Sequence, residues 1–281
     1  YQKMRALIIY LVISAVFIGC TPILSIDAST QSVYHFSDTD KNISLLDISE
    51  TFGTYDGSFV LYDNNLDSWK IYDLEEATKR IPPESTYKIY DSLLGLESGI
   101  ITPEHSSMTW NGDAFPFPSW EADQDLNSAM QNSVNWYFQA IDSQLGINRV
   151  QEFLNKIEYG NQTTSSNLDL YWSDFSLKIS PLEQVTLLKK FNTNEFHLNS
   201  QNVFSVKNAI KIASTPNGNF YGKTGTGRVN GQDINGWFIG YVETSDNSYY
   251  FATNIQSDSN ATGKKAFEIT SDILKKLHIW N

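Results

Sequence analysis

The sequence predicts an α+β fold, built on one antiparallel five-stranded sheet with flanking helices and a helical insertion. Two β-rich segments come first, at residues 57–63 and 68–73, and three more lie in the last third of the chain. Between the two runs, apolar residues repeat at helical spacing, and one more helical segment follows the last strand. Two runs of strands around a block of helices favour a single sheet interrupted by an insertion.

The first two strands are predicted to form a hairpin. Residues 57–63 (GSFVLYD) and 68–73 (SWKIYD) alternate and are rich in β-forming side chains. The turn-forming stretch NNLD lies between them. A helix is expected from about Ser85 to Glu97, stopped by Gly99.

The middle of the chain is predicted to be mainly helical. Residues 125–146 carry apolar side chains at helical spacing and end in a glycine. Residues 180–191 begin with a capping box, in which Ser180 and Glu183 satisfy each other's free N–H groups. Pro181 occupies the first helical position, where its missing N–H costs nothing.

The last third returns to strands, which are predicted at residues 221–227, 236–244 and 249–255. The tight turn SDNS joins the second and third of these strands. A closing helix is expected from about Lys264 to Leu277.

Residues 1–25 predict a membrane-spanning helix with a basic cytoplasmic flank. Residues 6–24 contain no charged side chain, and Lys3 and Arg5 stand just before them. A helix of this length covers the roughly 30 Å hydrocarbon core of a bilayer. The basic flank faces the cytoplasm, so the rest of the chain is expected outside the cell.

Two other interpretations of this segment stay open. From Met4 onwards it would serve as a cleaved signal peptide, and FIGC resembles a lipoprotein cleavage box with Cys20 as the lipidated residue. Both also export the rest of the chain. Residues 26–50, polar and without a sustained period, are expected to form a linker, and residues 51–281 an extracellular domain.

Charge and composition argue against several classes of function. The chain carries 20 basic and 32 acidic residues, a net charge of −12, with no basic block, which argues against nucleic acid as a partner. Its single cysteine excludes an internal disulfide, and its four histidines are scattered without an HExxH or CxxC pattern. A zinc site built from these residues is therefore not expected.

A serine and a lysine three positions apart open the first predicted helix. Ser85 and Lys88, in STYK, share a face of that helix, so the amine can reach the hydroxyl. A serine hydroxyl is a weak nucleophile until a neighbouring base takes its proton. The pair therefore predicts nucleophilic catalysis, and a capping serine beside a surface lysine is the structural alternative.

The strand segment KTGTG predicts an edge that binds an anion and an extended chain. Lys223, Thr224 and Thr226 offer a cation and two hydroxyls, and Gly225 lets a ligand approach the backbone closely. A nucleotide-binding loop is excluded, because the sequence has no GxxxxGK or GxGxxG pattern. A plain β-turn is the structural alternative.

A Ser-x-Asn element is expected between these two motifs. The literal SDN at 245–247 follows the KTG segment and lies in a predicted hairpin turn, so we interpret it as structural. Ser133 and Asn135, in SVN, are the better candidates. They are predicted inside the helix over 125–146, where helix propensity gives neither a reason to occur. A helix-surface position is the structural alternative.

The order of the three motifs carries a resemblance to a known family. Ser-x-x-Lys, Ser-x-Asn and Lys-Thr-Gly together resemble the penicillin-recognising serine acyltransferases, which include penicillin-binding proteins and serine β-lactamases. YGN at 159–161, WEADQDLNSAM before Ser133 and YWSDFSLKISPLEQV at 171–185 are similar to the class D branch. STYKIY, SVNWYF and NGWFIGYVETSDNSYYFAT resemble the extracellular sensor domains of the BlaR and MecR antibiotic receptors. The resemblance covers about residues 52–278 and implies a class D β-lactamase/transpeptidase-like fold.

The resemblance implies a role for each motif. The catalytic residues would be Ser85, Lys88, Ser133 and Asn135, and the substrate-binding residues Lys223, Thr224, Gly225, Thr226, Trp172, Tyr159 and Asn161. Ser85 would open a β-lactam ring and become acylated, and Lys88, carboxylated by CO2, would accept its proton. Ser133 would pass the proton to the departing ring nitrogen. The N–H groups of Ser85 and Thr226 would form the oxyanion hole.

Within this resemblance, the residue at position 135 separates sensors from hydrolytic enzymes. Hydrolytic class D enzymes usually have Ser-x-Val, whose apolar third residue shelters the lysine carbamate. The amide of Asn135 would instead hydrogen-bond Lys88 and favour loss of CO2 after acylation, so no water is activated and the ester persists. The sequence therefore predicts a β-lactam receptor that reports acylation across the membrane and induces resistance.

Three alternative functions stay open beside the receptor. A lipoprotein or secreted class D β-lactamase is the first alternative, and a peptidoglycan D,D-peptidase is the second. A non-catalytic binding module would not be labelled covalently at Ser85.

In the receptors a cytoplasmic zinc protease precedes the last membrane helix, so such a domain is expected upstream of Tyr1. The segment FPFPSW (115–120) is predicted to pack as a loop rather than to line a ligand cleft.

Overall fold

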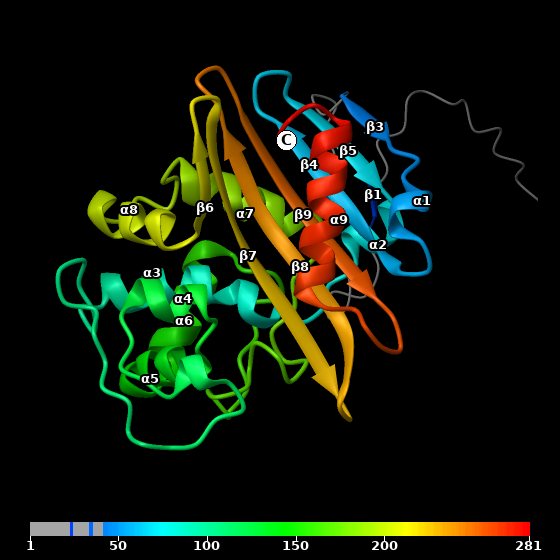
Figure 1. Cartoon of the computed structure of the whole chain (residues 1–281). Helices are drawn as coiled ribbons and strands as arrows, with labels where there is room; N and C mark the ends of the chain where they lie inside the picture. Colours follow the sequence, from blue (N-terminus) through cyan, green and yellow to red (C-terminus); the bar gives the residue numbers. More distant parts are fainter. Residues whose placement is uncertain (1–22, 25–33, 36–41) are drawn as a thin grey trace, which may run out of the picture.

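The computed structural model describes residues 23–24, 34–35 and 42–281 (Figure 1). The predicted membrane helix lies outside the described residues except for Ile23–Leu24, which forms strand β1 and pairs antiparallel with β2, Tyr34–His35. Within the described ranges, no helix is both long and apolar enough to cross a membrane. The membrane segment stays a prediction.

The main sheet has seven strands, whereas five are predicted from the sequence. Their order is β3-β5-β4-β9-β8-β7-β6. Neighbouring strands are antiparallel, except that β3 runs parallel to β5. The strands are β3 (Ile43–Leu45), β4 (Asp56–Asp63), β5 (Ser68–Tyr72), β6 (Lys211–Thr215), β7 (Gly218–Val229), β8 (Gln232–Glu243) and β9 (Ser248–Gln256). The prediction of five purely antiparallel strands is therefore wrong at both edges, and the five central strands are confirmed.

The two missed strands are short edge strands. β3 has three residues and lies within the stretch predicted as a linker, and β6 has five. Most of their side chains are exposed, so neither shows the alternation of buried and polar residues that predicts a strand. They form because β5 and β7 each offer an open backbone edge to pair with.

Helices cover both faces of the sheet (Figure 1). α9 (Gly263–Lys276) packs on one face, and α7 (Pro181–Asn192) packs on the other. The other helical segments are α1 (Ser49–Phe52), α2 (Leu74–Thr78), η1 (Glu84–Tyr87), α3 (Lys88–Glu97), η2 (Pro118–Trp120), α4 (Leu126–Gln131), α5 (Asn135–Leu145), α6 (Ile147–Ile157) and α8 (Ser200–Ala209). Most of them form the predicted insertion, which lies beside β7 in Figure 1.

Alternating side chains on the central strands build two cores. Trp237 and Tyr241 of β8 pack on the α7 side, and Phe238 and Val242 pack under α9. Burying a large apolar side chain contributes roughly 1.5–3 kcal/mol. A slip of one residue would move each of them to the wrong core, so the register of β8 is strongly fixed. β7, paired with β8 along its whole length, is fixed with it.

The predicted capping box at Ser180 is confirmed. Ser180 Oγ accepts a hydrogen bond from the N–H of Glu183 at 3.2 Å, and the Glu183 carboxylate accepts one from the N–H of Ser180 at 2.9 Å. Glu183 also forms an ion pair with Arg80 at 2.7 Å. This pair anchors the chain a few residues before Ser85.

The placement of Ser133 and Asn135 inside one continuous helix is wrong. The predicted helix is broken into α4, which ends at Gln131, and α5, which begins at Asn135. Ser133 lies in the break with φ of 52°, a left-handed conformation that a serine adopts only when its surroundings require it. The break directs the serine hydroxyl towards β7, where a regular helix would not place it.

Candidate active site

Ser85 lies in η1, where the sheet meets the helical insertion. The carbonyl of Pro82 accepts hydrogen bonds from Trp237 Nε1 at 2.8 Å and from Asn235 Nδ2 at 3.1 Å. The N–H of Glu84 donates to the carbonyl of Trp172 at 3.0 Å. These bonds tie the segment before Ser85 to β8 and to the loop that carries Trp172, so the serine is held in one position.

The amine of Lys88 lies between two hydrogen-bond acceptors. Its Nζ donates to Ser85 Oγ at 2.7 Å and to Asn135 Oδ1 at 2.6 Å. The side chain is only 1% exposed, and the rings of Phe138 and Trp172 lie 5.6 and 5.7 Å from the amine. The predicted contact between the serine and the lysine is therefore present, and so is the predicted contact with Asn135.

The surroundings of Lys88 favour a neutral amine. Burial lowers the pKa of Lys88 well below its usual value, and the nearby charge of Lys223 lowers it further. Asp91 and Glu84 act in the opposite direction. A neutral amine in contact with a serine hydroxyl can accept its proton, which is what activation of Ser85 requires.

Lys223 holds Ser133 from the opposite side of the site. Its Nζ donates to Ser133 Oγ at 3.1 Å and to the carbonyl of Thr224 at 2.9 Å. Burial lowers the pKa of Lys223 to about 7, so its charge is only weakly held when the site is free. An incoming carboxylate would favour the charged form.

The outer edge of β7 faces Ser85 with its backbone exposed. The N–H of Gly222 donates to the carbonyl of Ile210 on this edge at 2.9 Å. Because a strand repeats every two residues, the N–H groups of Thr224 and Thr226 point to the same edge. A Cβ added at Gly225 would lie 3.2 Å from the backbone nitrogen of Ser85, so the strand passes very close to the serine. The N–H groups of Ser85 and Thr226 can thus serve one oxyanion.

The Thr226 hydroxyl does not face this edge freely. Its Oγ1 accepts a hydrogen bond from the N–H of Gly263, the first residue of α9, at 2.9 Å. This bond fastens β7 to α9 and leaves the backbone of Thr226 as its contribution to the site.

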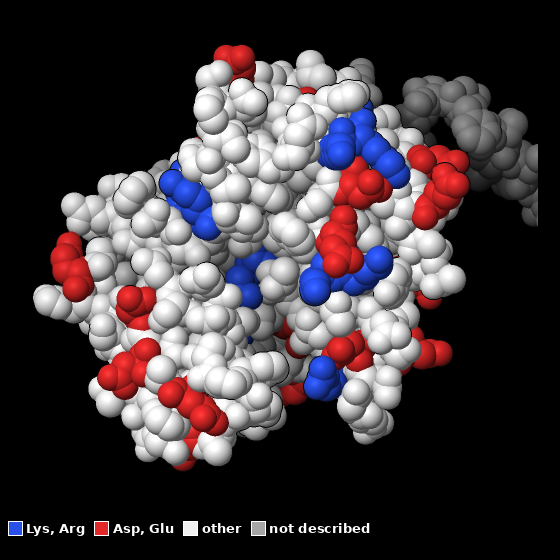
Figure 2. All heavy atoms as spheres, in the orientation of Figure 1, with Lys and Arg blue, Asp and Glu red and all other residues white. Residues whose placement is uncertain are grey.

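A cleft of about 380 Å³ joins these elements. It is lined by Ser85, Phe117, Ser119, Trp120, Asn132, Ser133, Asn135, Thr224, Gly225, Thr226, Arg228 and Asp233. Figure 2 shows that this face of the molecule is hollowed near its centre, with basic side chains inside the hollow. Arg228 on the rim of the cleft is paired with Asp233, so Lys223, directly behind the cleft, is the cation that a ligand carboxylate would favour.

The predicted site residues divide into three groups by position. Ser85, Ser133, Asn135, Thr224, Gly225 and Thr226 line the cleft, and Lys88, Lys223 and Trp172 lie directly behind it. Tyr159 and Asn161 lie away from it. The ring of Tyr159 is fully buried against Tyr87 and Tyr90, and the Asn161 side chain bonds the backbone of Ser176 and Lys178. In this structure Tyr159 and Asn161 support the walls of the site.

Several cleft residues were not assigned from the sequence. Phe117 is 52% exposed beside the cleft, and Trp120 is held there because its Nε1 donates to the carbonyl of Asn132 at 3.0 Å. The segment 115–120 therefore lines the cleft, against the prediction of simple loop packing. Arg228 and Asp233 form an ion pair at 2.8 Å on the far rim. The only sequence signal for Arg228 was its position directly after KTGTG.

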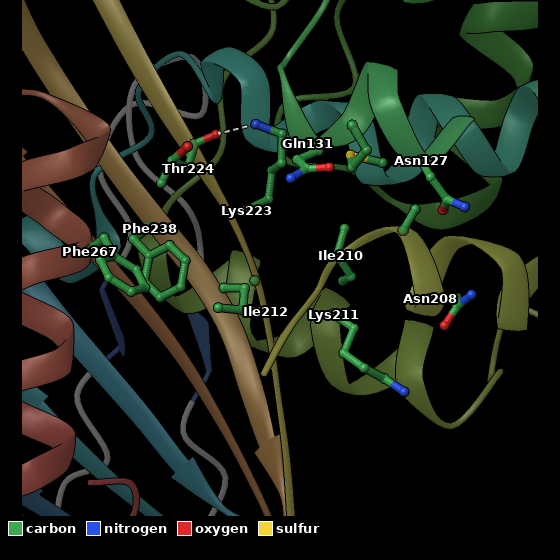
Figure 3. A pocket seen from close by; sticks show the side chains of 13 residues that line it. Asn127, Gln131, Asn208, Ile210, Lys211, Ile212, Lys223, Thr224, Phe238 and Phe267 are labelled. Atoms are coloured by element: carbon green, nitrogen blue, oxygen red, sulfur yellow. Dashed lines mark hydrogen bonds between the residues drawn. The ribbon is translucent and has the colours of Figure 1, made fainter. Parts of the chain in front are cut away.

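A second cavity of about 460 Å³ adjoins the cleft at Thr224 and is also lined by Lys223 (Figure 3). Its walls come from α4, the end of α8, β6 and β7, and they carry Asn127, Gln131, Asn208 and Lys211. Figure 3 shows the Lys223 side chain on the wall of this cavity, bonded to the Thr224 carbonyl.

Comparison with known proteins identifies the family. Residues 53–275 match the model of the penicillin-binding protein transpeptidase domain. The regulatory protein BlaR1 of Bacillus licheniformis is 44% identical over 98% of this chain, and the methicillin resistance mecR1 protein of Staphylococcus aureus is 38% identical over 99%. These matches cover 45% and 47% of the two relatives, so the chain spans about half their length.

Solved structures agree with this assignment. The C-terminal domain of the Bacillus licheniformis BlaR penicillin-receptor aligns with a TM-score of 0.83 and 45% identity, covering 85% of this chain and 98% of that one. Class D β-lactamase BAT-2 aligns with a TM-score of 0.79 and 36% identity, covering 84% and 97%. The chain therefore belongs to the penicillin-binding protein transpeptidase-domain family, has a class D β-lactamase-like fold and is a homologue of the BlaR1 and MecR1 regulatory proteins.

Proposed function

We propose that this protein is a β-lactam receptor in which the antibiotic acylates Ser85 and the ester is long-lived. The hydrogen bond from Lys88 Nζ to Asn135 Oδ1, at 2.6 Å, is the observation that carries the proposal. Through this bond the amide of Asn135 engages the side chain that would have to act as the base in hydrolysis of the ester. The likeness to a domain named as a penicillin-receptor supports β-lactams as the ligand.

The residues of the cleft account for the acylation step. Ser85 Oγ attacks the lactam carbonyl while Lys88 takes its proton, and the N–H groups of Ser85 and Thr226 bind the oxyanion. The C–N bond of the ring then breaks. Ser133, in contact with Lys223, delivers a proton to the released nitrogen. Lys223 and Thr224 bind the ligand's carboxylate.

Asn135 then explains why the ester persists. To hydrolyse the ester, a base must take a proton from a water molecule beside it. Lys88 is the nearest base, and its amine is bonded to Asn135 as well as to Ser85. In this proposal the carbamate of Lys88 is the base that would activate water, and Asn135 favours the uncarboxylated amine by accepting its N–H.

The surroundings of Lys88 fit its carboxylation by CO2. The amine is buried, its lowered pKa favours the neutral form that reacts with CO2, and Asn135 can present its NH2 group instead of its oxygen. When present, the carbamate would offer its oxygens as the base for the Ser85 proton. Loss of CO2 after acylation would return Lys88 to its bond with Asn135.

The membrane part of the proposal concerns residues 1–25 and the sequence upstream. The chain spans about half of relatives named as regulatory and methicillin resistance proteins. We infer that residues 6–24 anchor the domain in the cell membrane with residues 51–281 outside. A cytoplasmic zinc protease upstream would convert acylation into induction of resistance.

A hydrolytic class D β-lactamase is the second candidate, because the chain is 36% identical to BAT-2 over nearly all of that enzyme's chain. The detergent-solubilised chain, mixed with a small excess of a chromogenic cephalosporin in bicarbonate buffer, separates the two. The receptor gives one burst of colour and a stable mass adduct that is absent in Ser85→Ala. Continuous colour, with the mass returning to that of free protein, would establish the β-lactamase instead.

A further inference from the structure

A third cavity, of about 150 Å³, lies beside the segment that carries Ser85. It is lined by Ile81, Pro82, Glu84, Ser173, Phe175, Gly227, Arg228, Val229, Ile234, Asn235 and Gln256. Of the described residues in this lining, only Arg228 also lines the cleft, and none lines the second cavity. The third cavity is therefore a separate site, and none of its side chains has a role in the acylation of Ser85.

The walls of the third cavity are mainly apolar, with a buried floor and an exposed mouth. Pro82 and Glu84 are buried, whereas the side chains of Phe175 and Val229 are 52% and 40% exposed. Phe175 has a φ of 71°, a left-handed conformation that is rare for a bulky side chain. The volume is well below the roughly 300–1,000 Å³ of a site for a drug-sized ligand. The cavity therefore suits a small molecule with a compact hydrocarbon body.

The carboxyl group of Glu84 is the one acidic group in this lining. The side chain is 6% exposed, and it packs so closely under β7 that a Cβ added at Gly227 would collide with the carboxyl. Oε1 accepts one long hydrogen bond, from Asn235 Nδ2 at 3.5 Å. No donor among the described residues bonds Oε2. The carboxyl is thus buried with a single weak partner, and it borders the cavity.

The backbone holds Glu84 in this position against its own preference. Glu84 has a φ of 52°, and its N–H is fixed by a 3.0 Å hydrogen bond to the carbonyl of Trp172. A buried carboxyl with so few donors is unfavourable, whereas an apolar side chain of similar size would carry no such cost. A donor that enters through the mouth of the cavity can reach this carboxyl.

We propose that the third cavity binds a small primary amine, whose ammonium group donates to the Glu84 carboxylate while its hydrocarbon body contacts Phe175 and Val229. A hydrogen bond between charged groups is roughly twice as strong as a neutral one, and burial of the hydrocarbon adds to it. Arg228 at the mouth forms an ion pair with Asp233 at 2.8 Å, so its charge is already matched. This site does not depend on the reaction with β-lactams.

Few charged groups surround the Glu84 carboxyl. Lys88 of α3 is the only charged group among the described residues that acts on its proton affinity. The other charged residues on the surrounding elements are Glu76 of α2, which bonds Gln256 at 3.4 Å, Asp174 of the loop at the mouth, and the pair of Arg228 and Asp233.

Binding of an amine at this site should depend on pH. Burial raises the pKa of Glu84 to about 8, so the carboxyl is mainly protonated at pH 7 and must release its proton to pair with an ammonium. The affinity for the amine should therefore rise about tenfold from pH 6 to pH 7 and level off above about pH 8. A neutral ligand of the same shape should show no such rise.

Isoamylamine and isoamyl alcohol are matched probes, because they share one hydrocarbon body and differ in charge. Binding to the detergent-solubilised full chain, without antibiotic, is followed through the methyl NMR signals of Val229 and Ile234 between pH 6 and pH 8.5. We expect the amine to bind about 30-fold more tightly than the alcohol at pH 8.5. Equal affinities, or no rise with pH for the amine, would overturn the proposal. Tighter binding of isovalerate than of the amine would also overturn it, since Arg228 would then select an anion.

Two kinds of variant locate the probe. Glu84→Gln keeps the size of the side chain and removes its charge, so the amine should lose about 30-fold in affinity and its pH dependence, and the alcohol should stay within threefold. Phe175→Ala should weaken both probes about fivefold. Phe117→Ala is the matched control, because that ring is also 52% exposed but lines the cleft. Weaker binding in Phe117→Ala and not in Phe175→Ala would place the probe in the cleft and refute the site. If Glu84→Gln does not fold, the pH dependence in the unmodified chain still decides.

Discussion

The two buried lysines of the site differ in what surrounds their amines. Lys88 is 1% exposed, lies between two aromatic rings and bonds two side chains, whereas Lys223 is 6% exposed and bonds one hydroxyl and one carbonyl beside two cavities. Burial lowers the pKa of both. These surroundings fit the proposed roles of the two lysines, which are proton transfer at Lys88 and anion binding at Lys223.

Replacing Lys88 tests its proposed role as the base and should have the largest effect. Lys88→Met keeps the length and removes the base, so we expect the second-order rate of acylation to fall about 10³-fold. Stopped-flow measurement with a chromogenic cephalosporin gives this rate. Ser85 would still be present and the cleft unchanged in shape, so a rate within tenfold of the unmodified protein would mean that Lys88 is not the base.

Asn135→Val tests the other contact of the Lys88 amine. With the amide gone, we expect the ester to hydrolyse about 100-fold faster, because Lys88 becomes available to activate water. Intact mass after a single acylation measures the lifetime. Asn132→Val is the matched control, since Asn132 lines the same cleft but its side chain bonds the carbonyl of Ser128. Equal lifetimes in the two variants would remove Asn135 from the explanation.

The first of these contacts could be predicted from the sequence, and the second partly. The spacing of Ser85 and Lys88 on one helical face is a local property, so the motif alone indicated their contact. The bond between Lys88 and Asn135 joins residues 47 positions apart and came from a resemblance. The break that turns Ser133 towards Lys223 depends on its left-handed backbone, which no helical periodicity encodes.

Other features could not be predicted from the sequence, and the structure shows why. The edge strands β3 and β6 have mostly exposed side chains, and the pattern that predicts a strand is one of alternating burial. Tyr159 and Asn161 were assigned to the ligand by resemblance, and the structure places them in the supporting walls.

Lys223→Met tests the proposed role of the second lysine in binding the ligand carboxylate. We expect acylation to need about 30-fold more cephalosporin, because a charge-assisted hydrogen bond to the ligand carboxylate is lost. The ester lifetime should stay within about threefold, because Lys223 does not bond Ser85 or Asn135. The concentration dependence of the burst and the mass decay measure the two quantities. A large change in lifetime would contradict the division of roles between the two lysines.

Glu84 gives the smallest predicted effect, and it concerns stability. This residue precedes Ser85, is 6% exposed and has φ of 52°, and its carboxyl accepts a hydrogen bond from Asn235 at 3.5 Å. Burial raises the pKa of Glu84 to about 8, although Asn235 and Lys88 oppose the rise. The group is therefore protonated in the folded protein at neutral pH and ionised in the unfolded chain.

The sign of the pH dependence follows from this difference. Between its ordinary pKa and about 8, the folded state holds one more proton than the unfolded state, so stability falls as the pH rises. From pH 7 to pH 8 this loss is about 1 kcal/mol. Glu84→Gln carries no such proton and should lose that much less over the same step, as measured by urea unfolding at the two pH values. Lys223 titrates in both proteins, and burial alone lowers its pKa, so its contribution cancels in the difference. Parallel losses in the two proteins would mean that Glu84 is ionised in the fold and contributes its charge to Lys88 after all.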